Sequence, residues 1–316
     1  MVMKLIIDVD TGTDDALAIM VALAQSDVEV LAITCVHGNV RVNEGCRNTL
    51  RVLQTCDRLD IPVYKGAAKP LVMKSHPLTH YHGLDGLGDT SIDSASPVDI
   101  SIIKEEFAAV AMVNLVNKYP GEVTLVALAP LTNLSLAQHL DPEFGKKLKS
   151  LLIMGGNITG KGRVTPCAEH NFFCDPESAY NTLNEIGRQT SCRILAYEVA
   201  LEHRLSWEWF DRWTSTDTKK AKFVKAFLKS DATRQRDELK LGGFRCCDPQ
   251  AIACLFYDGC VLESKKCYCT VELNGSLTRG QMVVDWNGVL GQEPNTEIIS
   301  KINCDLLKNG FEAAIK

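Results

Sequence analysis

The chain has 316 residues, of which 46% are hydrophobic and 23% are charged, and its formal net charge is −5. This is an ordinary globular composition, and no apolar run reaches the roughly 18 residues that a membrane span needs. The sequence has no basic block, and together with the negative net charge this argues against nucleic acid as the main partner.

The amino terminus and the cysteines both indicate an intracellular protein. The opening "MVMKLIIDVD" turns polar at Asp8 with no small-residue cleavage site after it, so we expect no signal peptide. The 13 cysteines are scattered along the chain, several within apolar runs such as "AITCV" and "AIACLF", as is typical of reduced thiols. None of them forms a C-x-x-C pair with a partner at zinc spacing. We therefore predict a cytoplasmic location and no thiolate metal site.

Short β-branched segments alternate along the chain with longer amphipathic ones. A strand is expected at "KLIIDVD", a helix at 14–25, a strand at "VEVLAITCV" and a helix at 43–56. Further strands are expected in "IPVYKG", "VTLVAL", "SLLIMGG" and "CRILAYEV", each followed by a helix-like stretch. This βαβ order predicts a single α/β domain over residues 1–316. We expect a Rossmann-like domain whose mostly parallel central sheet is flanked by helices on both faces.

Two segments are expected to lie outside this regular pattern. Residues 74–100 are polar and rich in glycine, histidine and serine, which predicts a long loop of functional importance. Residues 205–241 contain Trp207, Trp209, Trp213 and many charges, and we expect helices on the outside of the domain or over a pocket.

Four aspartates lie close together after the first predicted strand. Asp8 and Asp10 end this strand, and Asp14 and Asp15 open the next helix, with Gly12 permitting the turn between them. Helix capping explains one or two of these acids but not all four. Buried carboxylates at this spacing repel one another, so a bound hard cation such as Ca²⁺ explains the set better.

Two familiar acidic motifs can be compared with this segment, and only one of them resembles it. An EF-hand loop does not fit, because the twelfth residue counted from Asp8 is Ile19 and not glutamate. The D-x-D fragment also resembles the opening of haloacid-dehalogenase-type phosphatases. In that alternative Asp8 is the nucleophile that forms an aspartyl-phosphate, and Asp10 is the acid/base group with Mg²⁺. The alternative leaves "AEHN" and "CDPQAIA" unexplained.

Seven segments in the same order resemble the inosine-uridine-preferring nucleoside hydrolases, which are Ca²⁺ enzymes that cleave the N-glycosidic bond of ribonucleosides. They are "DVDTGTDDALAIM", "VHGNV", "HGLDGLG", "ALAPLTNLSLA", "MGG", "VTPCAEHNFFCDPESA" and "CDPQAIA". The resemblance runs from Asp8 to about Ala253, and "VELNGSLTRGQMVVD" matches the closing region. It implies conversion of a ribonucleoside and water to ribose and free base, a role in nucleoside metabolism such as purine salvage, and a homodimer or homotetramer. Purine, pyrimidine and nonspecific base preferences stay open.

The resemblance also implies roles for the motif residues. The Ca²⁺ ligands would be Asp10, Asp15, Asp248 and the main-chain carbonyl of Leu128, and Asp10 would also take the proton from the metal-bound water. The ribose would be surrounded by Asp14, Asn39, Glu169 and Asn171, with Met154 lining its pocket. Such groups suit the task because each sugar hydroxyl can both donate and accept a hydrogen bond. Asp8 is expected to hold the loop by hydrogen bonding.

The chain departs from the family pattern at two positions. Many members have a histidine before the last aspartate ligand, whereas this chain has Cys247, a weaker acid–base group near neutral pH. His82 of "YHGLDGLG" then becomes the main titratable candidate for protonating the leaving base. Arg163 stands where the usual pattern has an asparagine near the 5′ end of the ribose. It would point to solvent, pair with Glu169, or favour a substrate with a negative group there.

These two departures keep a third hypothesis open beside the hydrolase and the phosphatase. In that hypothesis the chain is a catalytically weakened protein that binds a nucleoside or ribose.

Overall fold

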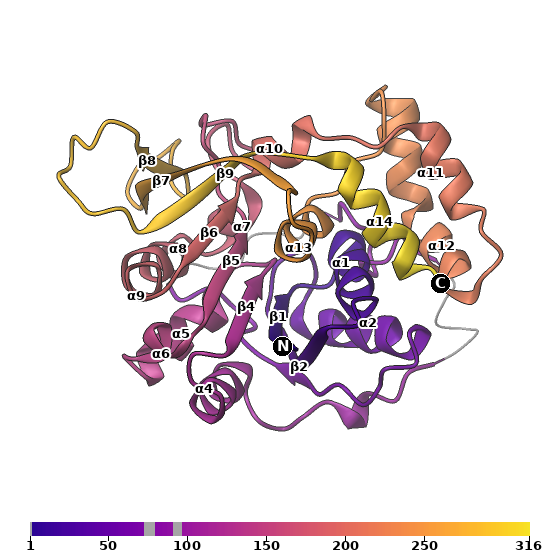
Figure 1. Cartoon of the computed structure of the whole chain (residues 1–316), viewed down its shortest axis with the longest axis horizontal. Helices are drawn as coiled ribbons and strands as arrows, with labels where there is room; N and C mark the ends of the chain where they lie inside the picture. The colour runs from indigo at the N-terminus through magenta and orange to yellow at the C-terminus, as the bar shows by residue number, and fades with distance from the viewer. Residues whose placement is uncertain (1, 73–79, 91–96) are drawn as a thin grey trace.

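The computed structural model describes residues 2–72, 80–90 and 97–316. A nine-stranded sheet in the order β3-β2-β1-β4-β5-β6-β9-β7-β8 runs through its centre (Figure 1). The strands are β1 (Met3–Val9), β2 (Val28–Cys35), β3 (Val63–Lys65), β4 (Val123–Ala127), β5 (Ser150–Met154), β6 (Cys192–Leu195), β7 (Val261–Val271), β8 (Met282–Asp285) and β9 (Thr296–Ile302). All neighbouring pairs from β3 to β9 are parallel, whereas β7 is antiparallel to β9 and β8. The predicted α/β fold is confirmed, and the antiparallel edge is an addition to it.

Helices cover both faces of this sheet. One face carries α1 (Thr13–Leu23), α2 (Val42–Thr55), α10 (Tyr197–Glu202), α11 (Trp207–Thr214), α12 (Lys219–Thr233), α13 (Asp248–Phe256) and α14 (Cys304–Ala314). The other face carries α4 (Ala108–Lys118), α5 (Thr132–Leu140), α6 (Phe144–Lys147), α7 (His170–Cys174) and α8 (Pro176–Asn181). The described residues also contain the π-helical segments Thr182–Ile186 and Arg234–Glu238, the short helix α9 (Gly187–Gln189) and the 3₁₀ turn Ile100–Ile102.

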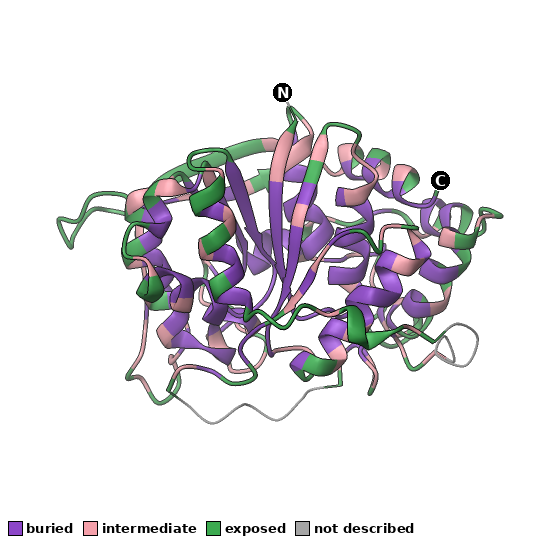
Figure 2. Ribbon diagram, turned by 90° about the horizontal axis from the view of Figure 1, so that it is seen from below, coloured by how far each residue is buried: buried purple, intermediate pink, exposed green. Residues whose placement is uncertain are grey.

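The central strands are apolar on both sides because both faces are covered. In β1, Leu5, Ile7 and Val9 pack into the core on the α1 side, while Ile6 packs into the core on the α4 side. Figure 2 shows these strands as buried ribbons between two helical layers. This alternation explains why the first strand reads as a nearly continuous hydrophobic run.

The predicted element boundaries are mostly confirmed, but β3 (Val63–Lys65) covers only half of the expected "IPVYKG", and a second strand is also shorter than expected. The two helices expected at 14–25 and 43–56 correspond to α1 and α2. The strand expected in "CRILAYEV" ends at Leu195, because the chain turns into α10 at Tyr197. Part of the long loop expected at 74–100 lies outside the described residues, and 80–90 contains neither helix nor strand.

The helices expected in 205–241 are confirmed as α11, α12 and the π-helical segment after them. Trp209 and Trp213 stack with ring centres 5.2 Å apart. The indole nitrogen of Trp213 donates to the Phe311 carbonyl at 2.8 Å, which fastens α11 to α14. No helix in the described part of the chain is long and apolar enough to cross a membrane.

Candidate functional site

The predicted site residues meet at the carboxyl edge of the sheet. Asp8 of β1 is in register with Thr34 of β2 and Ala127 of β4, so the loops after these three strands start at the same level. The chain leaves β1 toward β2 and β3 on one side and returns as β4 on the other. Such a switch point opens a crevice between the diverging loops, and ligand sites in open α/β sheets occur there.

Two helix amino termini bring three carboxylates together at this crevice. Asp14 and Asp15 lie in the first turn of α1, and Asp248 begins α13, which packs beside α1 (Figure 1). One carboxylate oxygen from each residue lies within 4.8 Å of the other two. The positive ends of both helix dipoles favour negative charge at this point. The sequence had predicted Asp10 together with Asp15 and Asp248. In the structure, the three carboxylates that lie nearest one another are those of Asp14, Asp15 and Asp248.

Asp10 lies beside this group and is held by the loop after β2. Its carboxylate accepts hydrogen bonds from the Asn39 backbone N–H at 2.6 Å and from Asn39 Nδ2 at 3.0 Å. Asn39 Nδ2 also reaches Asp15 Oδ2 at 3.3 Å, so one amide group links the two acids. A Cβ atom on Gly38 would collide with the Asp10 carboxylate, which explains the glycine before Asn39.

The donor set fits a hard cation. Asp14 Oδ1 and Asp15 Oδ1 are buried, and neither has a hydrogen-bond partner among the described residues. Burial, together with the neighbouring carboxylates, raises the pKa of Asp15 to about 7 and the pKa values of Asp10 and Asp248 well above their usual range. Uncompensated carboxylates are costly to bury, and oxygen-rich sites of this kind are what Ca²⁺ binds.

A network of amide and carboxylate groups lines the adjoining space. Asn171 Nδ2 donates to the Leu128 carbonyl at 2.9 Å and to the Met154 carbonyl at 3.1 Å. Glu169 caps α7 and accepts from the backbone N–H groups of residues 156, 171 and 172 at 2.8–3.1 Å. Burial raises the pKa of Glu169 to about 6. All the predicted ribose residues line this space, namely Asp14, Asn39, Met154, Glu169 and Asn171.

His82 is buried at the same site and is held as a neutral ring. Its Nδ1 accepts from the Thr13 N–H at 3.3 Å and lies 2.7 Å from Thr13 Oγ1. These contacts assign the ring proton to Nε2, which faces Asp14 Oδ1 at 3.7 Å. Burial is the main cause that lowers the pKa of His82 to about 3, with a smaller contribution from the positive charge of Arg163.

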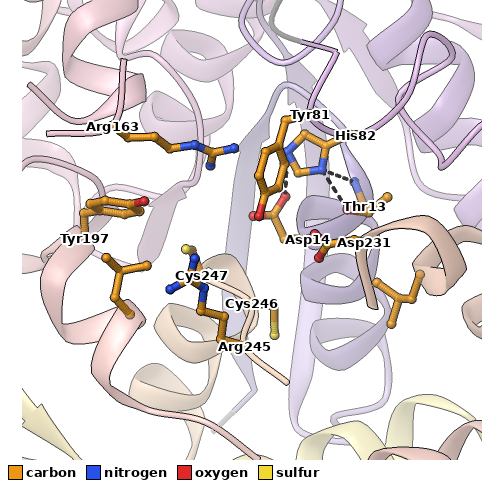
Figure 3. A pocket seen from close by; sticks show the side chains of 12 residues that line it. Thr13, Asp14, Tyr81, His82, Arg163, Tyr197, Asp231, Arg245, Cys246 and Cys247 are labelled. Carbon is orange, nitrogen blue, oxygen red and sulfur yellow. Dashed lines mark hydrogen bonds and ion pairs between the residues drawn. The ribbon is translucent and has the colours of Figure 1, made fainter. Parts of the chain in front are cut away.

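A second space adjoins the first and contains residues that the sequence did not single out. Figure 3 shows it lined by Tyr81, Tyr197, Asp231 and Arg245 together with Arg163, Cys246 and Cys247. Tyr81 precedes His82, and Arg245 lies two residues before Cys247. Their closeness to these motif residues was the only sequence feature that could have marked Tyr81 and Arg245 as site residues. No sequence signal marked Tyr197 of α10 or Asp231 of α12.

Arg163 and Cys247 have defined environments in this space. The Arg163 guanidinium stacks on the Tyr81 ring, 3.5 Å from its centre, and forms no ion pair with Glu169. Burial, followed by the nearby Asp14 carboxylate, raises the pKa of Cys247 to about 12. Its thiol is therefore protonated at neutral pH and cannot act as a thiolate there.

The raised carboxylate pKa values predict that protons and Ca²⁺ compete. A group whose pKa is raised by folding favours the folded state below its unfolded pKa of about 4, and this advantage is lost as the pH rises through the folded value of about 7. The carboxylates therefore destabilise the metal-free protein most above pH 7. We expect the increase in Tm caused by 1 mM Ca²⁺ to be largest near pH 8 and to shrink toward pH 5.5.

This competition is measured by thermal unfolding with Ca²⁺ or chelator across the pH range. The comparison at each pH cancels the opposing effect of the buried histidines His37 and His82, whose pKa values burial lowers. A Ca²⁺ effect that is constant or grows toward low pH would show that the cation does not bind at these carboxylates.

Comparison with known proteins places the chain among nucleoside-cleaving enzymes. The family model for "Inosine-uridine preferring nucleoside hydrolase" matches residues 5–309. The pyrimidine-specific ribonucleoside hydrolase RihA of Salmonella arizonae is 33% identical over 98% of this chain and 96% of its own length. A probable uridine nucleosidase 2 of Arabidopsis thaliana is 42% identical, over 56% of this chain and 54% of its own length. A solved inosine-guanosine nucleoside hydrolase superposes with a TM-score of 0.90 at 31% identity, covering 100% of this chain and 99% of its own.

Proposed function

The chain belongs to the inosine-uridine preferring nucleoside hydrolase family, and we propose that it acts at the carboxylate crevice described above. It is a nucleoside N-ribohydrolase, which converts a ribonucleoside and water to ribose and a free base. The observation that carries the placement of the site is the group formed by Asp14, Asp15 and Asp248 beside Asp10, with buried oxygens that lack partners among the residues described. Four acids at the switch point need a cation, and they border a space lined by groups that suit a sugar.

We propose Ca²⁺ as the cation of this metal-dependent family. Asp10, Asp15, Asp248 and the Leu128 carbonyl would hold it, with Asp14 adjoining. When bound, Ca²⁺ lowers the pKa of a water molecule and binds ribose hydroxyl oxygens, so that it supplies both activation and positioning. The flexible, oxygen-rich coordination that Ca²⁺ accepts matches a set of carboxylates and one main-chain carbonyl better than an octahedral Mg²⁺ site would.

Asp10 is the proposed general base. Its burial and the nearby Asp15 raise its pKa above the usual range of an aspartate, which favours uptake of a proton by this carboxylate. The two hydrogen bonds from Asn39 fix the carboxylate and use one lone pair on each oxygen. A second lone pair on each oxygen remains to accept a proton.

The amide groups can accept hydrogen bonds from ribose. Both hydrogens of the Asn171 amide are used by main-chain carbonyls, and those of the Asn39 amide face Asp10 and Asp15. Their Oδ1 atoms remain as acceptors. We propose that these atoms and the Asp14 carboxylate accept hydrogen bonds from the sugar hydroxyls, with Glu169 and Met154 shaping the pocket. Such a site discriminates against deoxynucleosides, because a missing hydroxyl leaves a buried acceptor unpaired.

The leaving base is proposed to accept a hydrogen bond from the Nε2–H group of the neutral His82 ring, or a proton from solvent, and not to depend on Cys247. Cys247→Ser is expected to slow hydrolysis of inosine and of p-nitrophenyl riboside alike, by less than about tenfold. The reason is that the thiol is a weak hydrogen-bond donor with a pKa raised by burial. Steady-state rates on both substrates check this, since a general-acid defect grows with the basicity of the leaving group.

His82→Ala, measured on the same two substrates, is the comparison for this experiment. If His82 is the donor, its loss slows the hydrolysis of inosine more than the hydrolysis of p-nitrophenyl riboside. A large loss selective for inosine in Cys247→Ser, with His82→Ala nearly silent, would assign the proton donor to the cysteine.

The phosphatase alternative is not favoured by the surroundings of Asp8. Its Oδ1 accepts from Thr34 Oγ1 at 2.6 Å and from Asn133 Nδ2 at 2.8 Å, and it lines neither of the two spaces. The Asp8 side chain therefore bonds to β2 and α5, whereas the sequence suggested that it would hold the loop after β1. Inosine, uridine, cytidine and adenosine, tested with Ca²⁺ and with chelator, distinguish the hypotheses. Release of reducing sugar supports nucleoside hydrolysis. Release of phosphate from phosphoesters supports the phosphatase, and binding without turnover supports a nucleoside-binding protein.

Assembly as a homodimer or homotetramer, a cytoplasmic location and a role in purine salvage stay predictions from the family resemblance. Sedimentation at working concentration tests the first of them, and a monomer there would contradict it.

A further inference from the structure

Two arginines face the second space without a carboxylate partner. Arg163 lies in the loop between β5 and α7, and Arg245 lies three residues before α13. Across residues 2–72, 80–90 and 97–316, the Arg163 guanidinium stacks on Tyr81 and forms no ion pair or hydrogen bond, and that of Arg245 forms none either. Arg163 is exposed and Arg245 is half-buried, so both keep N–H donors accessible to a ligand in the pocket that they line.

The other charges that line this space are already compensated. Asp231 accepts from Arg234 at 2.5 Å and from Gln235 at 2.7 Å. Arg234 in turn stacks 3.3 Å from the centre of the Tyr81 ring, on the face opposite Arg163, since one face cannot hold two guanidinium groups at these distances. Asp14 belongs to the carboxylate group assigned to the cation, and the His82 ring is neutral. Among the residues that line the second space, Arg163 and Arg245 therefore leave an excess of positive charge.

The orientation of the two side chains suits an anion between them. Stacking occupies the face of the Arg163 guanidinium and leaves its edge of N–H donors free. In Figure 3, Arg163 enters the space from above and Arg245 from below, with Tyr197 and Cys247 beside them. Burial raises the pKa values of Tyr197 and Cys247, and the positive charges of both arginines oppose this effect, which supports a common location for the two charges. Arg163 also lines the proposed ribose space, so it lies where the two spaces meet.

Resting on the proposed function, we propose that the site prefers ribonucleosides bearing an anionic oxygen group, which Arg163 and Arg245 bind together. The group is a phosphate on the ribose or a carboxylate on the base, since both present the oxygen pairs that guanidinium groups bind. A neutral nucleoside leaves both guanidinium groups without a directly bonded anion. Charge-assisted hydrogen bonds are the stronger kind, so the anion gains affinity relative to its neutral analogue.

The first test uses the unaltered protein and pairs of ligands that differ by the anionic group. Ribose is compared with ribose 5-phosphate, and uracil with orotate, as inhibitors of uridine hydrolysis. We expect at least one anion to inhibit at a concentration about tenfold or more below that of its neutral partner, and higher salt to reduce the difference. The pair that responds identifies the ribose or the base as the carrier of the charge. If neither anion inhibits at a lower concentration than its neutral partner, the proposal is wrong.

Direct comparison of uridine, uridine 5′-monophosphate and orotidine separates this proposal from the proposed function. A higher kcat/KM for either anionic substrate supports the proposal. Cleavage of uridine with no preference for either anionic substrate overturns the preference alone. If none of these three, nor inosine, is cleaved, the proposed function itself fails.

Arginine variants assign the effect to the two guanidinium groups. We expect Arg163→Gln and Arg245→Gln each to lower the ratio of kcat/KM for the preferred anionic substrate to that for uridine by about tenfold or more. Arg236→Gln is the matched control, because Arg236 is outside the pocket, bonded to Asp211 and stacked on Trp207. Equal losses on charged and neutral substrates would show a structural role and overturn the assignment. If a variant does not fold, the inhibitor comparison on the unaltered protein still decides.

Discussion

Asp10→Asn is expected to lower kcat on inosine or uridine by at least about a hundredfold while Ca²⁺ remains bound. The substitution keeps the shape of the side chain but removes the group that accepts a proton, and general-base catalysis typically contributes a hundredfold or more. In the unaltered protein, two N–H donors of Asn39 bond to the two carboxylate oxygens of Asp10. In the variant, the new amide N–H group would face one of these donors. Reversal of the Asn39 amide would relieve this conflict, so we expect a modest decrease in Tm and a large decrease in rate.

Asp8→Asn is the matched control for this variant. Asp8 is a fully buried aspartate two residues earlier, and burial raises its pKa to about 7, so a neutral amide resembles a form that it readily adopts. Its Oδ1 can still accept from Thr34 and Asn133, and the Oδ2 position has no partner among the described residues that an amide would disturb. We expect Asp8→Asn to keep activity within a few-fold. Near-normal turnover of Asp10→Asn, with Ca²⁺ binding shown by calorimetry, would refute Asp10 as the base.

Asp248→Asn is expected to change stability in opposite directions with and without Ca²⁺. In the metal-free protein the variant should unfold at a higher temperature than the unaltered chain, because a buried carboxylate facing Asp14 and Asp15 is replaced by a neutral group. With Ca²⁺ the order should reverse, because the variant has lost a charged ligand and gains less from the cation. At limiting Ca²⁺ its activity should fall by at least about a hundredfold.

Thermal unfolding and rate measurements over a range of Ca²⁺ concentrations test this prediction. Excess Ca²⁺ should restore part of the activity of Asp248→Asn but not that of Asp10→Asn, because the first defect is mainly in binding and the second in proton transfer. Asp211→Asn, at an exposed aspartate of α11, serves as the control for loss of one negative charge. If Asp248→Asn were destabilised equally with and without Ca²⁺, Asp248 would be a structural residue and not a ligand.

The arrangement of Asp10, Asp14 and Asp15 was predictable from the sequence because it is local. An apolar run followed by D-x-D, a glycine and two acids specifies a strand, a tight turn and a helix start within eight residues, and each step follows from backbone conformation and capping. The alternation of strands and helices likewise predicted the parallel sheet, since a chain that buries both faces of its strands repeats one pattern. Local patterns thus predicted the fold class and one side of the site.

The antiparallel edge and the end of β6 were not predictable in the same way. β7 pairs with β9 and β8, but strand direction and order depend on which edges meet after folding. "CRILAYEV" is apolar enough for a longer strand, yet the chain enters α10 at Tyr197. An apolar run is compatible with either conformation when it is buried, so packing decides between them.

The rest of the site depended on segments far apart in the sequence. The sequence by itself identified Asp248, through its motif, but its approach to Asp14 required α13 to pack against α1. Tyr197 and Asp231 come from different helices and carry no local signal of a common pocket. The protonation states of His82 and Cys247 were also decided by the tertiary structure, because pKa shifts arise from burial and from charges that only folding brings near. Local chemistry is set by neighbours in the chain, whereas burial and charge pairing are set by neighbours in space.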